Sequence, residues 1–222
     1  MKIALDKLKW FLLAIFFWYL DIYTQKFLFE GKDLKNTVPA LIAVAGLVLV
    51  LVLVFILMKL LKEPLSLKAF KDSQAALYMI GFPAAIGINL TGGVIRVLLN
   101  GSADTANQNA LNNSGMPFYL LLVFGILFAP ILEELIFRKC LLEKVFGFGR
   151  WKWLGLAVTS FLFGYVHLIS DLGNIGGWVS YTGIGLVFGY VLIWSKRIEY
   201  SIAIHILMNV LVFLMQFLAT MR

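Results

Sequence analysis

Two adjacent carboxylates, Glu133 and Glu134, lie at the end of a strongly apolar stretch of the sequence. Ionisable side chains within membrane-spanning segments are rare, because inserting each one costs roughly 2.5–3.5 kcal/mol even on lenient scales. Carboxylates in such a place are expected to serve chemistry, for example as a base that activates water. The plainer alternative is that both only anchor the inner end of the segment among the charges that follow it.

Helical spacing separates the roles of the two glutamates. Residues four apart share one face of a helix, so Glu134 and Arg138 are predicted to form an ion pair along one stripe. Glu133 points about 100° away from Glu134, toward a different neighbour. Glu133 is therefore the candidate for a free base, and Glu134 with Arg138 is predicted to support it.

The chain has two histidines, and each lies in an apolar segment with a companion four residues away. His167 follows Phe163, and His205 precedes Asn209. A lone histidine in an apolar helix is more often a hydrogen-bonded core residue than a catalyst. Two histidines placed in this way, together with Glu133, make a common site the stronger interpretation.

Depth in the membrane supports that interpretation. If the helices that carry Glu133 and His167 form a hairpin that turns near Arg150, each residue lies seventeen positions from the turn. Lys139 and Lys144 look cytoplasmic, so such a hairpin would have to protrude, tilt or break. His205 and Asn209 enter from the same inner side, and a conical cavity open to the cytoplasm could hold all four residues.

These residue types are suited to amide hydrolysis. A carboxylate and an imidazole, Glu133 and His167, can share a water and deprotonate it. His205 and the Asn209 amide can donate hydrogen bonds to the developing oxyanion. Glu133, His167 and His205 are also plausible zinc ligands, with water in the fourth position. The sequence lacks a His-Glu-x-x-His helix, which weakens the zinc alternative, so no cofactor is favoured.

Composition defines the elements that must position these residues. The chain has 222 residues, of which 61% are hydrophobic and 14% charged, with a mean hydropathy of +0.91. These values predict an all-α, polytopic transmembrane bundle, since each span of a bilayer needs about 20 apolar residues. An eighth helix is conceivable at residues 141–148, lying in the interface. The seven predicted spans are residues 9–29, 38–58, 75–99, 117–137, 153–169, 178–194 and 200–219.

The formal net charge of +7 does not indicate nucleic acid, because the basic residues follow the positive-inside rule. With the N-terminus inside, only Lys26, Lys32, Lys35 and Arg222 fall outside, and seven spans place the C-terminus outside. The predicted location is an integral membrane protein whose N-terminus is cytoplasmic. The basic residues predicted to be cytoplasmic are Lys2, Lys7, Lys9, Lys59, Lys62, Lys68, Lys71, Arg138, Lys139, Lys144, Arg150, Lys152, Lys196 and Arg197.

Three ordered motifs resemble those of the CPBP family, which comprises CAAX-type prenyl endopeptidases and bacterial bacteriocin-processing or immunity (Abi) proteins. The motifs are Glu133-Glu134-x-x-x-Arg138, Phe163-x-x-x-His167 and His205-x-x-x-Asn209. The resemblance covers residues 117–219 of a predicted single domain, 1–222. It implies an intramembrane endopeptidase in which Glu133 and His167 activate water while His205 and Asn209 stabilise the oxyanion.

The resemblance implies a bacterial plasma-membrane protease that cleaves a small membrane-associated or CAAX-like peptide or protein, in peptide maturation or bacteriocin immunity. Family members are described both as metalloproteases and as metal-independent glutamate proteases, and the Glu134–Arg138 pairing favours the latter. One rival is a non-catalytic immunity or scaffold protein. Another is a small transporter, with Glu133, His167 and Asn89 along an ion path. The sequence does not define the substrate or the oligomeric state.

Overall fold

The computed structural model describes residues 2–30, 37–62, 75–106, 108–109 and 122–220. Within these ranges all regular secondary structure is helical, which confirms the predicted all-α class. The helices are α1 (Lys2–Glu30), α2 (Thr37–Leu61), α3 (Ala75–Asn100), η2 (Val123–Phe128), α6 (Ala129–Glu134), η3 (Leu135–Phe146), α7 (Lys152–Leu168), α8 (Ile175–Ser195) and α9 (Ile198–Thr220).

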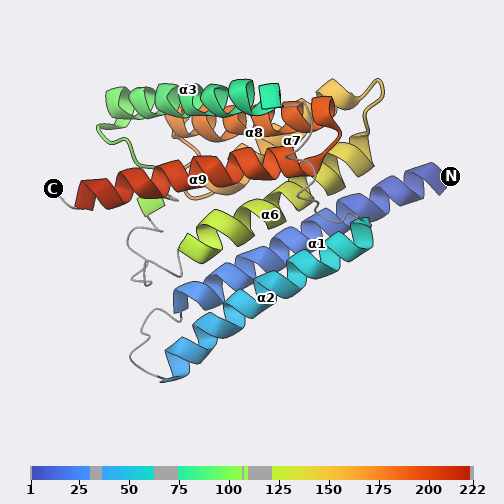
Figure 1. Cartoon of the computed structure of the whole chain (residues 1–222), viewed down its shortest axis with the longest axis horizontal. Helices are drawn as coiled ribbons and strands as arrows, with labels where there is room; N and C mark the ends of the chain where they lie inside the picture. Colours follow the sequence, from blue (N-terminus) through green and yellow to red (C-terminus); the bar gives the residue numbers. More distant parts are fainter. Residues whose placement is uncertain (1, 31–36, 63–74, 107, 110–121, 221–222) are drawn as a thin grey trace.

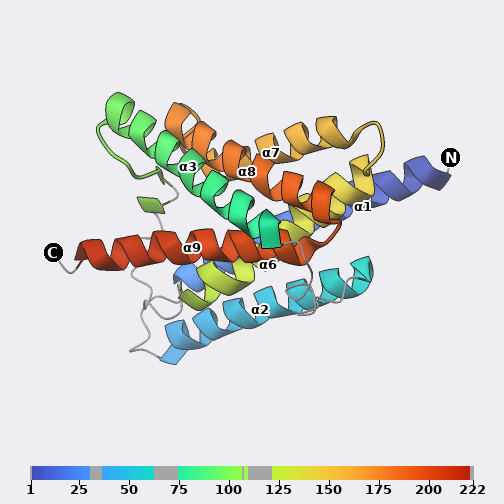
Figure 2. The ribbon, with the colours of Figure 1, turned by 45° about the horizontal axis from the view of Figure 1, so that its top comes forward.

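The helices form two outer groups around a central pair of rods. Helix α8 packs against both α3 and α7 on one side of the molecule, and α1 packs against α2 on the other (Figure 1). The continuous rod η2–α6–η3 and helix α9 lie between these groups, and α9 crosses the middle of the second view (Figure 2). The three predicted motifs lie on the rod, on α7 and on α9. The chain therefore brings them together at the centre of the bundle.

The central rod is π-helical on both sides of α6. Pro130 lies in the first turn of α6; it lacks an N–H, and its ring would clash with the carbonyl four residues earlier in a regular α-helix. The turns before it widen, so that the N–H of Ala129 bonds to the carbonyl of Phe124, five residues back. Segment η3 ends at Phe146 and is capped by Gly147, whose φ of 74° suits glycine. Residues 141–146 thus complete η3 and do not form a separate helix.

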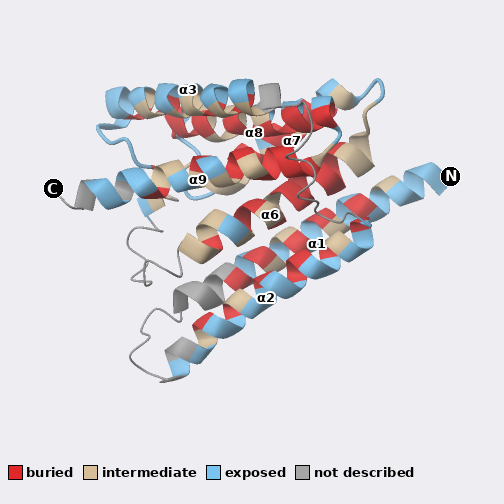
Figure 3. Ribbon diagram, in the orientation of Figure 1, coloured by how far each residue is buried: buried red, intermediate tan, exposed pale blue. Residues whose placement is uncertain are grey.

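Burial follows this arrangement. Buried residues concentrate along α6, η3, α8 and the first half of α9, while the outer faces of α2 and α3 are exposed (Figure 3). Those outer faces are apolar: Phe55 is 67% exposed, Met79 76% and Leu98 77%. Exposed apolar surface of this extent is unfavourable in water and is expected where lipid chains cover the protein. The polar motif residues lie on other helices (α6, η3, α7 and α9), on the sides that face the interior of the bundle.

In the part of the chain that the structure describes, four helices are long and apolar enough to cross a membrane. They are Leu41–Leu61 in α2, Tyr78–Asn100 in α3, Ile175–Ser195 in α8 and Ile198–Met215 in α9. The other three predicted spans correspond to α1, to the η2–α6–η3 rod and to the 17-residue α7. The total of seven or eight spans stays a prediction. The two termini lie at opposite ends of the bundle (Figure 1).

Small residues let α3 and α8 approach closely. A Cβ atom on Gly92 would lie 2.1 Å from Ser180 Oγ and 2.5 Å from the Gly176 carbonyl oxygen. In the same way, a Cβ on Gly176 would lie 2.4 Å from the Gly92 carbonyl oxygen. The two backbones meet there without intervening side chains, as is typical of glycine-rich contacts between membrane helices.

Replacing Gly92 by alanine should therefore destabilise the protein. The added methyl group meets backbone atoms that cannot rotate away, and overpacking of this kind costs about 1–3 kcal/mol. Gly87→Ala is the matched control on the same helix, because nothing lies within 4 Å of its Cβ position, and it should be neutral or stabilising by up to about 1 kcal/mol. Thermal unfolding in detergent measures both; equal shifts for the two variants would contradict the close contact.

Candidate active site

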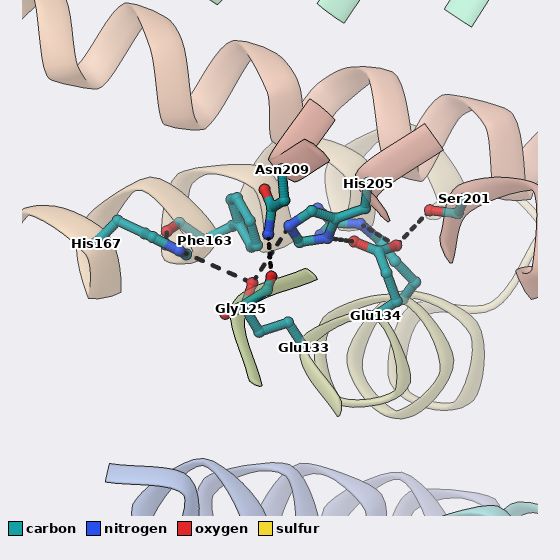
Figure 4. A network of polar contacts seen from close by, with 9 residues as sticks. Gly125, Glu133, Glu134, Phe163, His167, Ser201, His205 and Asn209 are labelled. Carbon is teal, nitrogen blue, oxygen red and sulfur yellow. Dashed lines mark hydrogen bonds and ion pairs between the residues drawn. The ribbon is translucent and has the colours of Figure 1, made fainter. Parts of the chain in front are cut away.

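The structure brings the side chains of Glu133, His167 and His205 together, although they come from three different helices. Glu133 lies in α6, His167 at the end of α7 and His205 in α9 (Figure 4). Glu133 Oε2 lies 3.8 Å from His167 Nε2 and 3.7 Å from His205 Nε2. The side chains of Glu133 and His167 are each 16% exposed and that of His205 is 7% exposed. The sequence-predicted meeting of Glu133 with both histidines is confirmed.

The orientation of His167 is fixed by its own helix and by two aromatic rings. Its Nδ1 lies 2.8 Å from the Phe163 carbonyl oxygen, and a carbonyl can only accept, so Nδ1 carries the proton. In the neutral ring Nε2 then has a free lone pair, and this is the atom that faces Glu133. Phe163 and Tyr181 pack against the imidazole with centroids 4.5 Å and 4.6 Å away. His167 is therefore positioned to accept a proton at Nε2.

Tyr181 is itself held from outside the site. Its hydroxyl lies 3.0 Å from Thr105 Oγ1, in the segment that follows α3. Thr105 is buried, and its Oγ1 also accepts a hydrogen bond from the Gln108 N–H. The stacked ring of Tyr181 thus connects the imidazole of His167 to the loop after α3.

His205 is fixed by Glu134. Its Nδ1 lies 3.2 Å from Glu134 Oε1, and its ring stacks on Phe188 with centroids 4.6 Å apart. Glu134 pairs with Arg138, so its carboxylate is an acceptor and His205 Nδ1 is the donor. Nε2 of His205 therefore accepts when the ring is neutral and donates only when the ring is doubly protonated. The predicted oxyanion role needs the second of these states.

Glu134 is the centre of a fully buried polar network. Arg138 Nε lies 3.4 Å from Glu134 Oε2, which confirms the predicted pairing, and both side chains are 0% exposed. The Ser201 hydroxyl donates to the same oxygen. Glu134 thus ties η3 to two positions of α9, one turn apart. Glu133 and Glu134 diverge, as helical geometry predicts: Glu133 faces His167 and Glu134 pairs with Arg138, while His205 lies between them with one ring nitrogen toward each.

The guanidinium of Arg138 is enclosed by phenylalanine rings. Its Cζ lies 5.0 Å from the ring centroid of Phe163, 5.9 Å from that of Phe188 and 6.0 Å from that of Phe137. Cations are attracted to the faces of aromatic rings, more strongly where water is excluded. Phe163 and Phe188 also contact the two histidines. The same aromatic rings therefore position the imidazoles and compensate the buried charge.

Asn209 lies beside this group, one turn beyond His205 on α9. Its Nδ2 donates to the Gly125 carbonyl oxygen at 2.7 Å (Figure 4). Gly125 belongs to η2, and a Cβ there would lie 2.9 Å from two ring atoms of Phe213. One N–H of the Asn209 amide is thus engaged by the backbone, and the second remains to serve the predicted oxyanion role.

The remaining atom of the site is Glu133 Oε2. It is buried and accepts no hydrogen bond from any residue that the structure describes. A buried acceptor without a hydrogen-bond donor costs roughly 1–3 kcal/mol, so such atoms are normally paired. Its position between two imidazole nitrogens is suited to a third molecule, such as a water or a substrate, that donates a proton.

Zinc was the alternative for these same three side chains. Both histidines have the outer hydrogen bonds that orient metal ligands, through Phe163 and Glu134. No set of three His, Cys, Asp or Glu side chains in the described part of the chain is arranged to hold a metal ion, however. Metal dependence is a question for chelation experiments.

Comparison with known proteins shows which family the chain resembles. A sequence model of the type II CAAX prenyl endopeptidase Rce1-like family matches residues 115–211, which include all three motifs. This part of the chain is therefore similar to the Rce1-like family. The resemblance inferred from the motifs is confirmed, and the chain is an integral membrane protein.

Three curated proteins are also similar in sequence to this chain. "Putative membrane peptidase YdiL" of Bacillus subtilis is 28% identical over 61% of this chain and 53% of its own length. UPF0177 protein YaiF of Lactococcus lactis is 33% identical over 52% and 50%. The membrane-embedded CAAX protease MroQ of Staphylococcus aureus is 26% identical over 56% and 51%. The chain spans about half the length of the curated relatives it matches. No solved structure shows significant similarity to it.

Sequence reasoning missed four residues of the candidate site. Ser201 and Phe188 contact the network through helix packing, and Tyr181 stacks on His167 from α8. Gly125 contributes a backbone carbonyl. Ser201 lies four residues before His205, so helical spacing alone could have indicated it. Asn89, named for the transporter alternative, lies on α3 and shares no hydrogen bond or ion pair with Glu133 or His167.

Breaking the buried Glu134–Arg138 pair should cost about 3–5 kcal/mol of stability, because the remaining charge stays buried. Arg138→Gln leaves the Glu134 carboxylate without its cation and should lower the unfolding temperature strongly. The double variant Glu134→Gln/Arg138→Gln removes both charges and should be more stable than Arg138→Gln. Unfolding measurements on the single and double variants test this; simple additivity would contradict a coupled pair.

Proposed function

We propose that the chain is an intramembrane endopeptidase in which Glu133 and His167 activate a water molecule. The observation that supports this most directly is the buried Oε2 of Glu133, which lacks a hydrogen bond from the described residues and faces two imidazoles. A water there can donate to Glu133 Oε2 and to His167 Nε2, both of which are acceptors. The Rce1-like match and the peptidase names of two relatives support the same reaction class.

In the proposed reaction, Glu133 removes a proton from the water and the hydroxide attacks the scissile carbonyl carbon. The carbonyl oxygen becomes an oxyanion, which accepts hydrogen bonds from His205 Nε2–H and from the second N–H of Asn209. The Glu134 carboxylate, at His205 Nδ1, balances the charge of the doubly protonated ring that this requires. When the C–N bond breaks, the proton held by Glu133 passes to the leaving nitrogen, which restores Glu133.

The proposed substrate is a small membrane-associated peptide or protein, prenylated or unmodified. One relative, MroQ, is named a CAAX protease, which supports a CAAX-like substrate. The proposed location is the bacterial plasma membrane, with the N-terminus cytoplasmic and the cavity open to the cytoplasm. Residues 117–219 would form the catalytic core of a single integral domain, with roles in peptide maturation or bacteriocin immunity.

Removing the proposed base should abolish cleavage without unfolding the protein. Glu133→Gln is nearly isosteric and cannot accept the proton, so kcat should fall by about 10²–10⁴-fold, and His167→Ala should act in the same direction. The measurement is cleavage of prenylated and unmodified membrane peptides by the reconstituted full chain, followed by mass spectrometry. Phe161→Leu, at a half-exposed position on the same helix as His167, is the control that should remain active.

The same assay distinguishes the alternatives. Cleavage that resists chelators would support the glutamate mechanism, whereas loss on chelation with recovery in zinc would assign Glu133, His167 and His205 as ligands. Retained cleavage in Glu133→Gln would refute the proposed base. If no peptide of the panel is cleaved and Glu133→Gln keeps its cellular function, the scaffold interpretation replaces the peptidase.

Tyr181 should act as a positioning residue in this reaction. Tyr181→Leu removes the ring that stacks on His167 and should lower kcat by about tenfold or more, with KM little changed, because small misplacements of a catalytic group are costly. Tyr181→Phe keeps the ring and loses the hydroxyl that bonds to Thr105, so it should retain most activity. Kinetics of both variants measure this; equal losses would indicate that the hydroxyl, and not the stacked ring, is what matters.

A further inference from the structure

A second group of charged residues lies outside the motifs, where η3 ends, α7 begins and α8 ends. Arg150, Lys152 and Lys196 belong to it, and each lies beside an aromatic ring. Arg150 Cζ is 5.0 Å from the ring centroid of Trp151, and Lys152 Nζ is 5.1 Å from that of Trp153. Lys196 Nζ lies 3.7 Å above Phe148. We call these six residues the basic-aromatic patch.

No carboxylate pairs with the three cations of the patch. The two acidic residues nearby are engaged elsewhere: Glu143 contacts Lys139 at 2.7 Å and Lys144 at 3.4 Å, and Glu199 contacts Arg197 at 3.7 Å. Among the residues that the structure describes, Arg150, Lys152 and Lys196 form no salt bridge. Three cations therefore stand together without an anion.

Lys196 is held in an unusual backbone conformation. It caps α8 with a φ of 59° and a ψ of 16°, in the left-handed region where glycine is usual and other residues are strained. Lys196 is exposed, but desolvation by the neighbouring protein lowers its pKa, and the like charge of Lys152 lowers it further, against the opposing effect of Glu143. The contact of Trp153 with Tyr190 brings the beginning of α7 next to the end of α8, so Lys152 and Lys196 are like charges on neighbouring helix ends. A bound anion between them would relieve their repulsion.

The surroundings of the patch are apolar and aromatic. Trp153 stacks on Tyr190 with centroids 6.3 Å apart, and Tyr190 contacts Trp194 at 6.2 Å. The three rings are 51%, 43% and 65% exposed, respectively. Trp194 is the penultimate residue of a candidate membrane span, and exposed Trp and Tyr residues gather at the level of lipid headgroups. The cations therefore stand at the height where phospholipid phosphates lie.

We infer that the basic-aromatic patch binds the phosphate of an anionic phospholipid, held by Lys152 and Lys196 with Arg150 beside them. Both parts of such a lipid match the surface. Its phosphate would contact the unpaired cations, and its acyl chains would lie along the exposed rings of Trp153, Tyr190 and Trp194. An acidic protein segment would satisfy the cations but would leave those rings without an apolar partner. This inference does not depend on the proposed peptidase activity.

Native mass spectrometry of the full chain in a neutral detergent can measure the dissociation constant for the first bound lipid. Phosphatidylglycerol should bind more tightly than phosphatidylcholine, and Lys152→Gln/Lys196→Gln should weaken phosphatidylglycerol about fivefold for each charge removed. Binding to phosphatidylcholine should change little. Lys152→Arg/Lys196→Arg keeps both charges and should retain the preference, which separates the loss of charge from a loss of fold.

Lys59→Gln/Lys62→Gln is the matched control, because it removes two exposed lysines predicted to lie on the same side of the membrane. The control should keep the phosphatidylglycerol preference. Equal weakening in both double variants would overturn the site, since it would show only a general effect of net charge. Inorganic phosphate that competes as well as phosphatidylglycerol at equal concentration would overturn the assignment to a lipid.

Discussion

The buried pairing of Glu134 with Arg138 is the interaction on which the rest of this structure depends. Both side chains are fully buried at the centre of the bundle, where an uncompensated charge would be prohibitive. Each half of the pair then serves a second purpose: Glu134 fixes His205 and Ser201 on α9, and Arg138 lies against the phenylalanine rings that also contact the histidines. One electrostatic requirement thereby fixes the positions of α7, α8 and α9 relative to the central rod.

Local patterns in the sequence were sufficient to predict how Glu133, Glu134 and Arg138 are arranged on the central rod. The pairing of Glu134 with Arg138 and the divergence of Glu133 follow from helical spacing, which any continuous helix of these residues would obey. The contact of Tyr181 with His167 could not be foreseen, because it depends on how α7 and α8 pack. Hydropathy likewise predicts apolar segments well, but it carries no signal for the π-helical turns around Pro130.

The central network around Arg138 and the basic-aromatic patch compensate positive charge in different ways. At the centre, Arg138 has both a carboxylate and aromatic rings, so its charge is compensated within the fold. At the edge, Arg150, Lys152 and Lys196 have aromatic rings alone. Where the fold supplies a carboxylate, the cation is part of the architecture; where the carboxylate is missing, the surroundings have to supply an anion.

The hydrogen bond from Asn209 to the Gly125 carbonyl has a mechanical consequence. Because Gly125 has no side chain, the Phe213 ring lies against its backbone, and α9 and η2 are joined there by a polar and an apolar contact. The Asn209 amide is therefore positioned by the spacing of two helices and not by a loop. Since membrane helices tilt to match the hydrocarbon thickness around them, the geometry at this amide is coupled to the thickness of the bilayer.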